Sequence, residues 1–178
     1  MYAGHAGLAL VAKSRRPRVP IALLVPVAFA PDWIQWTLSA LGVSRNPSIS
    51  HSLVSVVAGA TVVAGIFWFV SRSRDDALIV WLTYLSHWPA DFITAAKAIW
   101  PNSREFGLNL YQHPMVDVAV ESLVIALCWG AYRRSLPATG RTRYIGWAIP
   151  LGLVALQFGF ALIQNPAIKE PLKQMVAN

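Results

Sequence analysis

The sequence predicts an all-α integral membrane protein: a helical bundle of about five transmembrane helices preceded by a short N-terminal helix. Three observations predict this class. Hydrophobic residues make up 56% of the 178-residue chain, and charged residues only 13%, about half the share in an ordinary soluble domain. The apolar residues form runs of about 20, the length that a helix needs to cross a bilayer. Eight tryptophans and five tyrosines, several near the ends of these runs, suit the membrane interface.

Five apolar runs are long enough to cross the membrane, and short loops rich in Pro, Asn, Ser and Arg separate them. The predicted spans are residues 19–41, 49–70, 77–100, 115–132 and 144–164. Residues 2–12 are also apolar but too few to span, so they are interpreted either as a half-helix tucked into the bundle or as an interfacial anchor. No linker divides the chain, and residues 1–178 are predicted to form a single transmembrane domain.

The basic residues predict the orientation in the membrane, because cytoplasmic loops carry an excess of Lys and Arg. Ten basic residues lie in alternate loops, namely Lys13, Arg15, Arg16, Arg18, Arg72, Arg74, Arg133, Arg134, Arg141 and Arg143. Four lie in the opposite loops and the tail, namely Arg45, Arg104, Lys169 and Lys173. The first set is therefore expected in the cytoplasm and the C-terminus outside. The net charge of +7 is interpreted as this topology signal, and no nucleic-acid partner is predicted.

Six ionisable side chains lie within the predicted spans or at their ends, where such groups usually pair, line a cavity or bind an ion. They are Asp32, His51, His87, Asp91, Asp117 and Glu121. With the predicted orientation, all six lie in the outer half of the membrane. His87 and Asp91 are four residues apart and share one helical face. Asp117, close to the interface, is expected to be solvated, and the single Cys128, in an apolar run, is expected to be a buried inert thiol.

These side chains predict a divalent metal site, with zinc or manganese as the expected cofactor. A mixed set of imidazole nitrogens and carboxylate oxygens suits zinc, manganese or iron better than a thiolate-preferring metal. The candidate ligands are His5, Asp32, His51, His87 and Asp91. His5 reaches the others only if the N-terminal stretch folds back against the first span. Glu121 or Asp91 is the candidate for the carboxylate that orients an attacking water.

Each candidate also has a purely structural interpretation. His87 and Asp91 can form a hydrogen-bonded pair that fixes helix packing without a metal. His51 can be an interfacial residue at the start of the second span, with Ser50 as the helix N-cap. Asp32 can simply begin a helix after a proline.

Several short motifs add a family resemblance. They are GHAGLAL at residues 4–10, APDW at 30–33, SHS at 50–52, LSHWPADFIT at 85–94 and FGLNLY at 106–111. Their order and spacing resemble those of the bacterial membrane-bound, metal-dependent hydrolases of the YdjM type, over roughly residues 4–125. The resemblance implies a location in the bacterial inner membrane. It also implies the same ligand positions, His5, Asp32, His51, His87 and Asp91, with Glu121 as a weaker match.

The chain departs from that pattern in two places. Many relatives carry a second acidic residue after the Pro-Asp pair, where this chain has Ile34 and Gln35. Many also continue beyond the Asp of the third span with a His and a further Asp, where this chain has Ala95, Ala96 and Lys97. Both departures remove candidate ligands.

Three functions are compatible with these residues. The first is a membrane-embedded, metal-dependent hydrolase acting on an ester or phosphoester of a lipid-like substrate. The second is a non-catalytic accessory subunit of a larger membrane protein complex that retains a relic of the hydrolase site. The third is an ion or proton pathway through His87, Asp91 and Glu121, although the sequence lacks the internal repeats typical of transporters.

Overall fold

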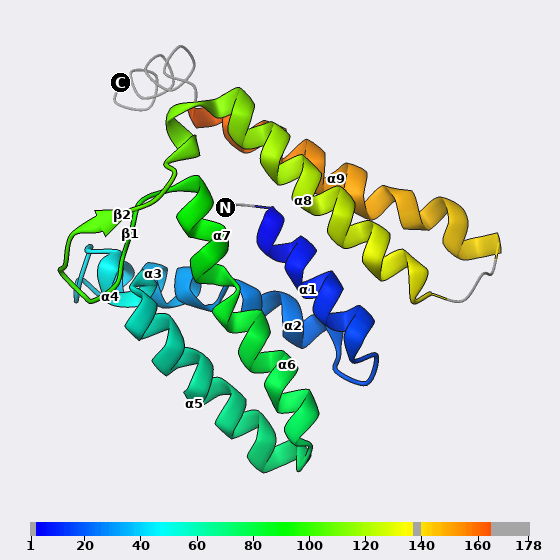
Figure 1. Cartoon of the computed structure of the whole chain (residues 1–178), viewed down its shortest axis with the longest axis horizontal. Coiled ribbons are helices and arrows are strands. Elements are labelled where there is room, and N and C mark those ends of the chain that lie inside the picture. Colours follow the sequence, from blue (N-terminus) through cyan, green and yellow to red (C-terminus); the bar gives the residue numbers. More distant parts are fainter. Residues whose placement is uncertain (1–2, 137–139, 165–178) are drawn as a thin grey trace.

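The computed structural model describes residues 3–136 and 140–164, and most of these residues are helical, as predicted. Figure 1 shows the helices gathered into one bundle, with a small hairpin at one end. The helices are α1 (Gly4–Arg15), α2 (Ile21–Ala28), α3 (Ala30–Ala40), α4 (Ser48–His51), α5 (Leu53–Ser71), α6 (Arg74–Leu85), α7 (His87–Thr94), α8 (Pro114–Arg134) and α9 (Gly140–Gln164). Strands β1 (Lys97–Ala98) and β2 (Glu105–Phe106) form the antiparallel hairpin, and a short 3₁₀ turn (Leu110–Gln112) follows it.

Two helices in the described part of the chain, α5 and α8, are long and apolar enough to cross a membrane. The pair α2 and α3 gives a third crossing if the two helices count as one bent span. The predicted number of about five is therefore not confirmed. The predicted third span is divided between α6, with 12 residues, and α7, with 8. In α9, the described apolar part is the shorter segment Gly146–Gly159.

Prolines explain why two predicted spans are broken. Pro31, near the start of α3, has no N–H to donate to the carbonyl four residues earlier, and the chain bends by 59° between α2 and α3. Pro89 likewise cannot donate to Leu85, and α6 ends there. The hydroxyl of Ser86 donates to the Thr83 carbonyl at this second break (2.7 Å), a contact that often bends helices. Length and hydropathy alone do not reveal such breaks.

Helix α1 is tucked into the bundle, one of the two arrangements considered for residues 2–12. It packs mainly against α8 and α2, and Ala9 is fully buried. The approach to α8 is close, because a Cβ added at Gly7 would lie 3.3 Å from the Cβ of Cys128. Cys128 is a buried free thiol, as expected. Helix α1 therefore carries its N-terminal residues into the protein interior.

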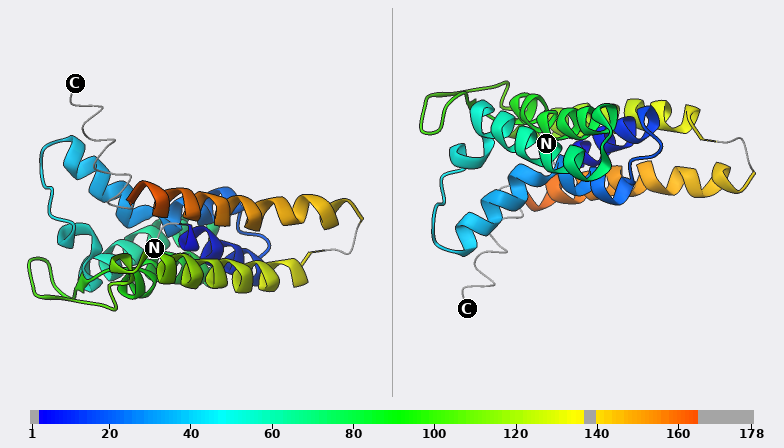
Figure 2. Two further views of the ribbon diagram at one scale, coloured as in Figure 1. Left: turned by 90° about the horizontal axis from the view of Figure 1, so that it is seen from above. Right: turned by 90° about the horizontal axis from the view of Figure 1, so that it is seen from below.

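The two ends of the bundle differ in character. Arg16, after α1, forms an ion pair with Asp75, at the start of α6, so two of the basic loops lie at the same end. Figure 1 shows α3, α4 and the β1–β2 hairpin near the other end. Figure 2 shows α3 projecting away from the α8–α9 pair. Between the ends, large apolar side chains such as Ile66, Phe69 and Leu127 are exposed, as expected for a surface that faces lipid.

Candidate metal centre

The structure brings together the five predicted ligands, which come from four helices. His5 lies in the first turn of α1, Asp32 in the first turn of α3, His51 at the end of α4, and both His87 and Asp91 in α7. Potential ligand atoms of His5, Asp32 and His87 lie within 4.8 Å of one another, and so do those of His51, His87 and Asp91. The side chain of Asp32 is 30% exposed, and the other four are buried. His87 belongs to both groups and is the centre of the cluster.

The surroundings of His87 fix which of its ring nitrogens carries the proton. Its Nδ1 lies 2.9 Å from the carbonyl oxygen of Ala28, at the end of α2. A carbonyl can only accept, so Nδ1 donates, and the neutral ring keeps a lone pair on Nε2. That buried Nε2 has no hydrogen-bond partner of good geometry, yet it lies 3.3 Å from Asp91 Oδ2 and 3.9 Å from Asp32 Oδ1. A lone pair therefore faces two carboxylates.

A chain of hydrogen bonds fixes His51 in the same way. The side-chain amide of Gln35 donates to the carbonyl of Ser44 (3.4 Å), which leaves its Oε1 to accept from the hydroxyl of Ser50 (2.9 Å). Because the Ser50 hydroxyl donates to Gln35, its oxygen accepts from His51 Nδ1 (2.7 Å). Nε2 of His51 is hydrogen-bonded to Asp32 Oδ1 (3.0 Å), and it is also the ring nitrogen directed at Asp91 and the potential metal position. Ser50 thus orients His51 and is not the helix N-cap.

The N-cap expected at Ser50 is instead Ser52, whose Oγ accepts from the backbone N–H of Ser55 at the start of α5 (3.3 Å). Two serines flank His51 in the sequence, and they have different partners. Spacing alone could not distinguish them, because the short helix α4 separates Ser50 from the start of α5.

His5 completes the cluster from the side of α1, outside the candidate spans. Its Nε2 bonds with Asp91 Oδ1 (3.1 Å), and its buried Nδ1 has no hydrogen-bond partner. The rings of His5 and His87 are stacked, with centroids 4.0 Å apart. Burial first, and the neighbouring His87 second, lower the pKa of His5 to about 4. His5 is therefore neutral near pH 7, the form that can coordinate a metal.

The donor set fits a divalent cation. Tetrahedral zinc with ligands at about 2.1 Å holds its ligand atoms about 3.4 Å apart. The separations of Asp91 Oδ2 from His87 Nε2 and His51 Nε2, 3.3 and 3.9 Å, bracket that value. The two histidines also donate their other ring N–H to a carbonyl and a hydroxyl, as metal-ligating histidines do. A cation between these atoms would give the buried Nε2 of His87 the partner that it otherwise lacks.

One cation already contacts the cluster, and it was not among the predicted site residues. The ammonium of Lys97, in β1, lies 2.7 Å from Asp91 Oδ2, and its side chain is only 14% exposed. In the sequence, Lys97 stands out only as a departure from the family pattern. The same is true of Gln35, and each of the two residues has a defined contact at the site.

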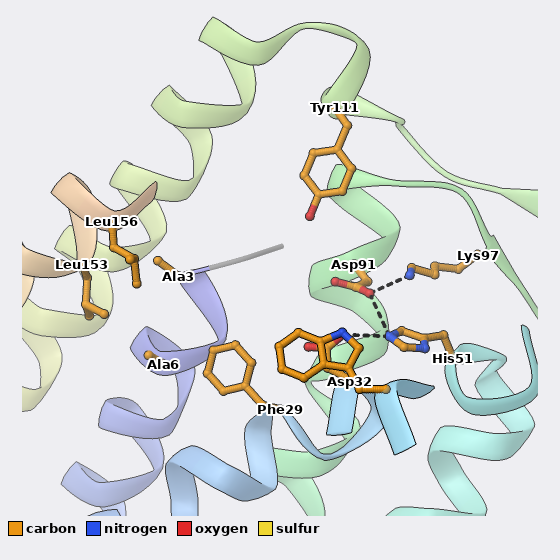
Figure 3. Close-up of a pocket in the computed structure, with 11 residues that line it drawn as sticks. Ala3, Ala6, Phe29, Asp32, His51, Asp91, Lys97, Tyr111, Leu153 and Leu156 are labelled. Atoms are coloured by element: carbon orange, nitrogen blue, oxygen red, sulfur yellow. Dashed lines mark hydrogen bonds and ion pairs between the residues drawn. The ribbon is translucent and has the colours of Figure 1, made fainter. Parts of the chain in front are cut away.

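A cavity of about 520 Å³ opens onto the cluster. Its polar end is formed by Asp32, His51, Asp91, Lys97 and Tyr111, and its apolar wall by Ala3, Ala6, Phe29, Trp36, Leu153 and Leu156. Figure 3 shows Lys97 and His51 directed at Asp91, with the Tyr111 hydroxyl pointing toward the same carboxylate. Leu153 and Leu156, from α9, lie on the opposite side. The cavity therefore has a charged end and an apolar end.

Two predicted residues of α8 lie outside the cluster. Glu121 is fully buried, and its Oε2 accepts from the backbone N–H of Gly4, at the start of α1. It is in neither group of potential ligands. Asp117 is buried rather than solvated, because Gln157 from α9 donates to its Oδ2 (3.2 Å). Gln157 is the polar residue in an otherwise apolar stretch of α9, and that contrast was the signal that could have revealed it.

The class that emerges is a helical membrane protein with a buried cluster of histidines and aspartates beside an amphiphilic cavity. A family model described as YdjM inner membrane protein matches residues 1–168, and the chain belongs to that family. No curated protein and no solved structure matches the chain. The family places the protein in the inner membrane, in contact with the lipid bilayer.

Proposed function

We propose that this protein is a metal-dependent hydrolase of the inner membrane that cleaves an ester or phosphoester of a lipid-like substrate. The single observation that carries the proposal is the cavity that joins the histidine–aspartate cluster to an apolar wall. A soluble substrate would not need that wall. A purely structural polar cluster would not need an adjoining cavity of about 520 Å³.

The proposed ligands are His51, His87 and Asp91, with His5 and Asp32 completing the set. A bound zinc or manganese ion would supply Lewis acidity, which polarises the scissile group and acidifies water. Asp32 is partly exposed and borders the cavity, so as a ligand it would hold the metal where a substrate in the cavity can reach it. The apolar wall would hold the hydrocarbon part of the substrate and exclude bulk water from the reacting end.

Glu121 is the weaker of the two catalytic candidates. Its bond to the Gly4 N–H supports a role in fixing the start of α1, and thereby the position of His5. Asp91, which interacts with four other members of the site, is the better candidate for direct participation.

The finer topology is also part of the proposal. Five crossings result if α6 with α7 and α9 each traverse the membrane in addition to the three candidate crossings. The ion pair between Arg16 and Asp75 supports a common side for two basic loops, which we propose to be cytoplasmic. The metal cluster then lies toward the opposite face. Lys169, Lys173 and the C-terminus, expected outside, are not among the described residues.

Metal analysis of detergent-purified protein tests the proposal. Wild type is expected to hold about one zinc or manganese ion per chain, and His87→Ala is expected to lose it. His113→Ala is the matched control, because His113 is an exposed histidine outside the cluster. The zinc-loaded wild type should also cleave a lipid-like ester or phosphoester, and His87→Ala should not. Absence of metal in wild type, together with no effect of His87→Ala, would end this proposal.

One observation favours the accessory-subunit alternative. The ammonium of Lys97 already neutralises Asp91, so part of the cluster is stable without a metal. A relic site would therefore bind no zinc, and the protein would copurify with other membrane subunits through exposed side chains such as Trp33 and Trp36. A monodisperse monomer after mild extraction would count against this alternative.

A further inference from the structure

The two ends of the cavity differ in charge as well as in polarity. Of the described residues that line it, the formally charged ones are Asp32, Asp91 and Lys97, all at the polar end. The apolar wall includes Phe29 and Leu156, and it carries no charge. A ligand that fills the cavity must therefore be an amphiphile with its polar group beside these three residues.

The charges at the polar end determine which polar group fits. The formal charges of two carboxylates and one ammonium sum to one net negative charge. A divalent cation in the cluster would turn this into one net positive charge. An uncompensated charge is costly in a site that is shielded from water. A monoanionic ligand restores neutrality, and a neutral or zwitterionic one does not.

Lys97 is placed to contact such an anion. It lies in β1, at the edge of the cavity, and its ammonium lies 2.7 Å from Asp91 Oδ2. An ammonium has three donor hydrogens, so the contact with Asp91 leaves others to donate. A cation bound to Asp91 would further weaken the hold of that carboxylate on Lys97. Figure 3 shows the Tyr111 hydroxyl directed into the same space.

We propose that the ligand of this cavity is a phospholipid-like amphiphile with a phosphodiester headgroup of one net negative charge, and that Lys97 selects it. This inference rests on the proposed function for the identity of the reacting group, but it concerns binding. In metal-free protein Lys97 pairs with Asp91, and in the loaded protein it donates to a phosphate oxygen. Lys97 is then a residue of substrate recognition.

Native mass spectrometry of detergent-purified protein tests this proposal directly. The protein, metal-free or zinc-loaded, is titrated with short-chain phosphatidylglycerol, which is monoanionic, or with phosphatidylcholine of the same chains, which is zwitterionic. Both lipids offer the same phosphodiester to Lys97, but the choline cation of phosphatidylcholine leaves the charge of the zinc-loaded site uncompensated. A charged interaction of this kind predicts a preference of about tenfold to a hundredfold for the monoanion in zinc-loaded wild type. Lys97→Met is expected to remove the preference, and Lys97→Arg to retain it.

Arg104→Met is the matched control. Arg104 is exposed, lies in the same hairpin and does not line the cavity, so its loss removes a nearby positive charge without touching the site. It should leave the preference unchanged. Equal binding of the two lipids in wild type, or an unchanged preference in Lys97→Met, would overturn the proposal. So would an equal loss in Arg104→Met, which would indicate surface attraction only.

The two proposals fail in different ways. If the preference for the monoanion holds but no ester or phosphoester is cleaved, the binding proposal stands and the hydrolase proposal fails. If a neutral lipid-like ester is cleaved and no preference for the monoanion is found, the hydrolase proposal stands and the binding proposal fails. The preference is expected in zinc-loaded protein, because the metal-free site carries one net negative charge and does not favour a monoanion.

Discussion

Replacing Ser50 with alanine is expected to change which ring nitrogen of His51 carries the proton, and so to weaken binding of a divalent ion. In wild type, the hydroxyl of Ser50 accepts from His51 Nδ1 and donates to Gln35. Ser50 and His51 are 4% and 6% exposed, so water has little room to replace the lost hydroxyl. Without that partner, the proton can move to Nε2, the atom that faces the metal site.

The size of the effect follows from the role of such supporting bonds. Loss of a hydrogen-bond partner of a metal-ligating histidine costs about 10- to 100-fold in metal affinity, or ~1.4 to 2.8 kcal/mol. The bonds at Ser50 are short, 2.7 and 2.9 Å, and buried, which favours the upper part of that range. Ser50→Thr retains a hydroxyl and is expected to recover most of the affinity.

Two measurements check this prediction. Nitrogen-15 NMR of protein labelled at its four histidines reports the tautomer of His51 without any metal, and a zinc titration reports affinity. Ser52→Ala is the control, because it removes the serine on the other side of His51. That change removes the N-cap of α5, with a loss of about 1 kcal/mol of stability, but leaves Ser50 in place. A wild-type tautomer and affinity in Ser50→Ala, or an equal loss in both variants, would refute the reasoning.

Three further predictions follow. Gly59→Ala should lower the free energy of unfolding by about 1–3 kcal/mol in a detergent melt, because the new Cβ would collide with the hydroxyl of the buried Tyr84 in α6. Gly65→Ala, on the same helix but with no atom near its Cβ position, should leave the free energy of unfolding unchanged. On a cysteine-free background, Arg104→Cys should react with an impermeant thiol reagent on intact cells and Arg74→Cys only after permeabilisation; the opposite pattern would invert the topology. Glu121→Gln should keep the zinc content of wild type, because an amide oxygen still accepts the N–H at the start of α1; loss of zinc would return this residue to the ligand set.

The sequence predicted the gathering of the site better than it predicted the membrane spans. Ionisable residues in apolar runs are costly, so their presence at positions 5, 32, 51, 87 and 91 was itself informative, and the structure brings all five together. Their role as metal ligands remains a prediction. Glu121 satisfied the same criterion, yet it bonds to a backbone N–H instead. Burial cost indicates that a polar group needs a partner, but it does not indicate which partner.

The number of spans was harder to predict because length and hydropathy describe a straight helix. In this chain, Pro31 and Pro89 interrupt two apolar runs, and the resulting short helices are individually too short to span. Gln35 and Ser50 could not be assigned either. Their contacts depend on the turn between α3 and α4, whose geometry no periodicity in the sequence describes.

The broken helices and the polar cluster explain each other. Inside a membrane, irregular backbone is tolerated only where protein or a cavity satisfies its polar groups. Here the carbonyl of Ala28, next to the first break, accepts from His87 Nδ1, just after the second break. That one bond links the two breaks and also sets the tautomer that points His87 Nε2 at Asp91 and Asp32. Two unbroken apolar spans would offer no free carbonyl at this depth. The helix breaks that hydropathy does not reveal therefore also provide the carbonyl that leaves His87 Nε2 free to coordinate a metal.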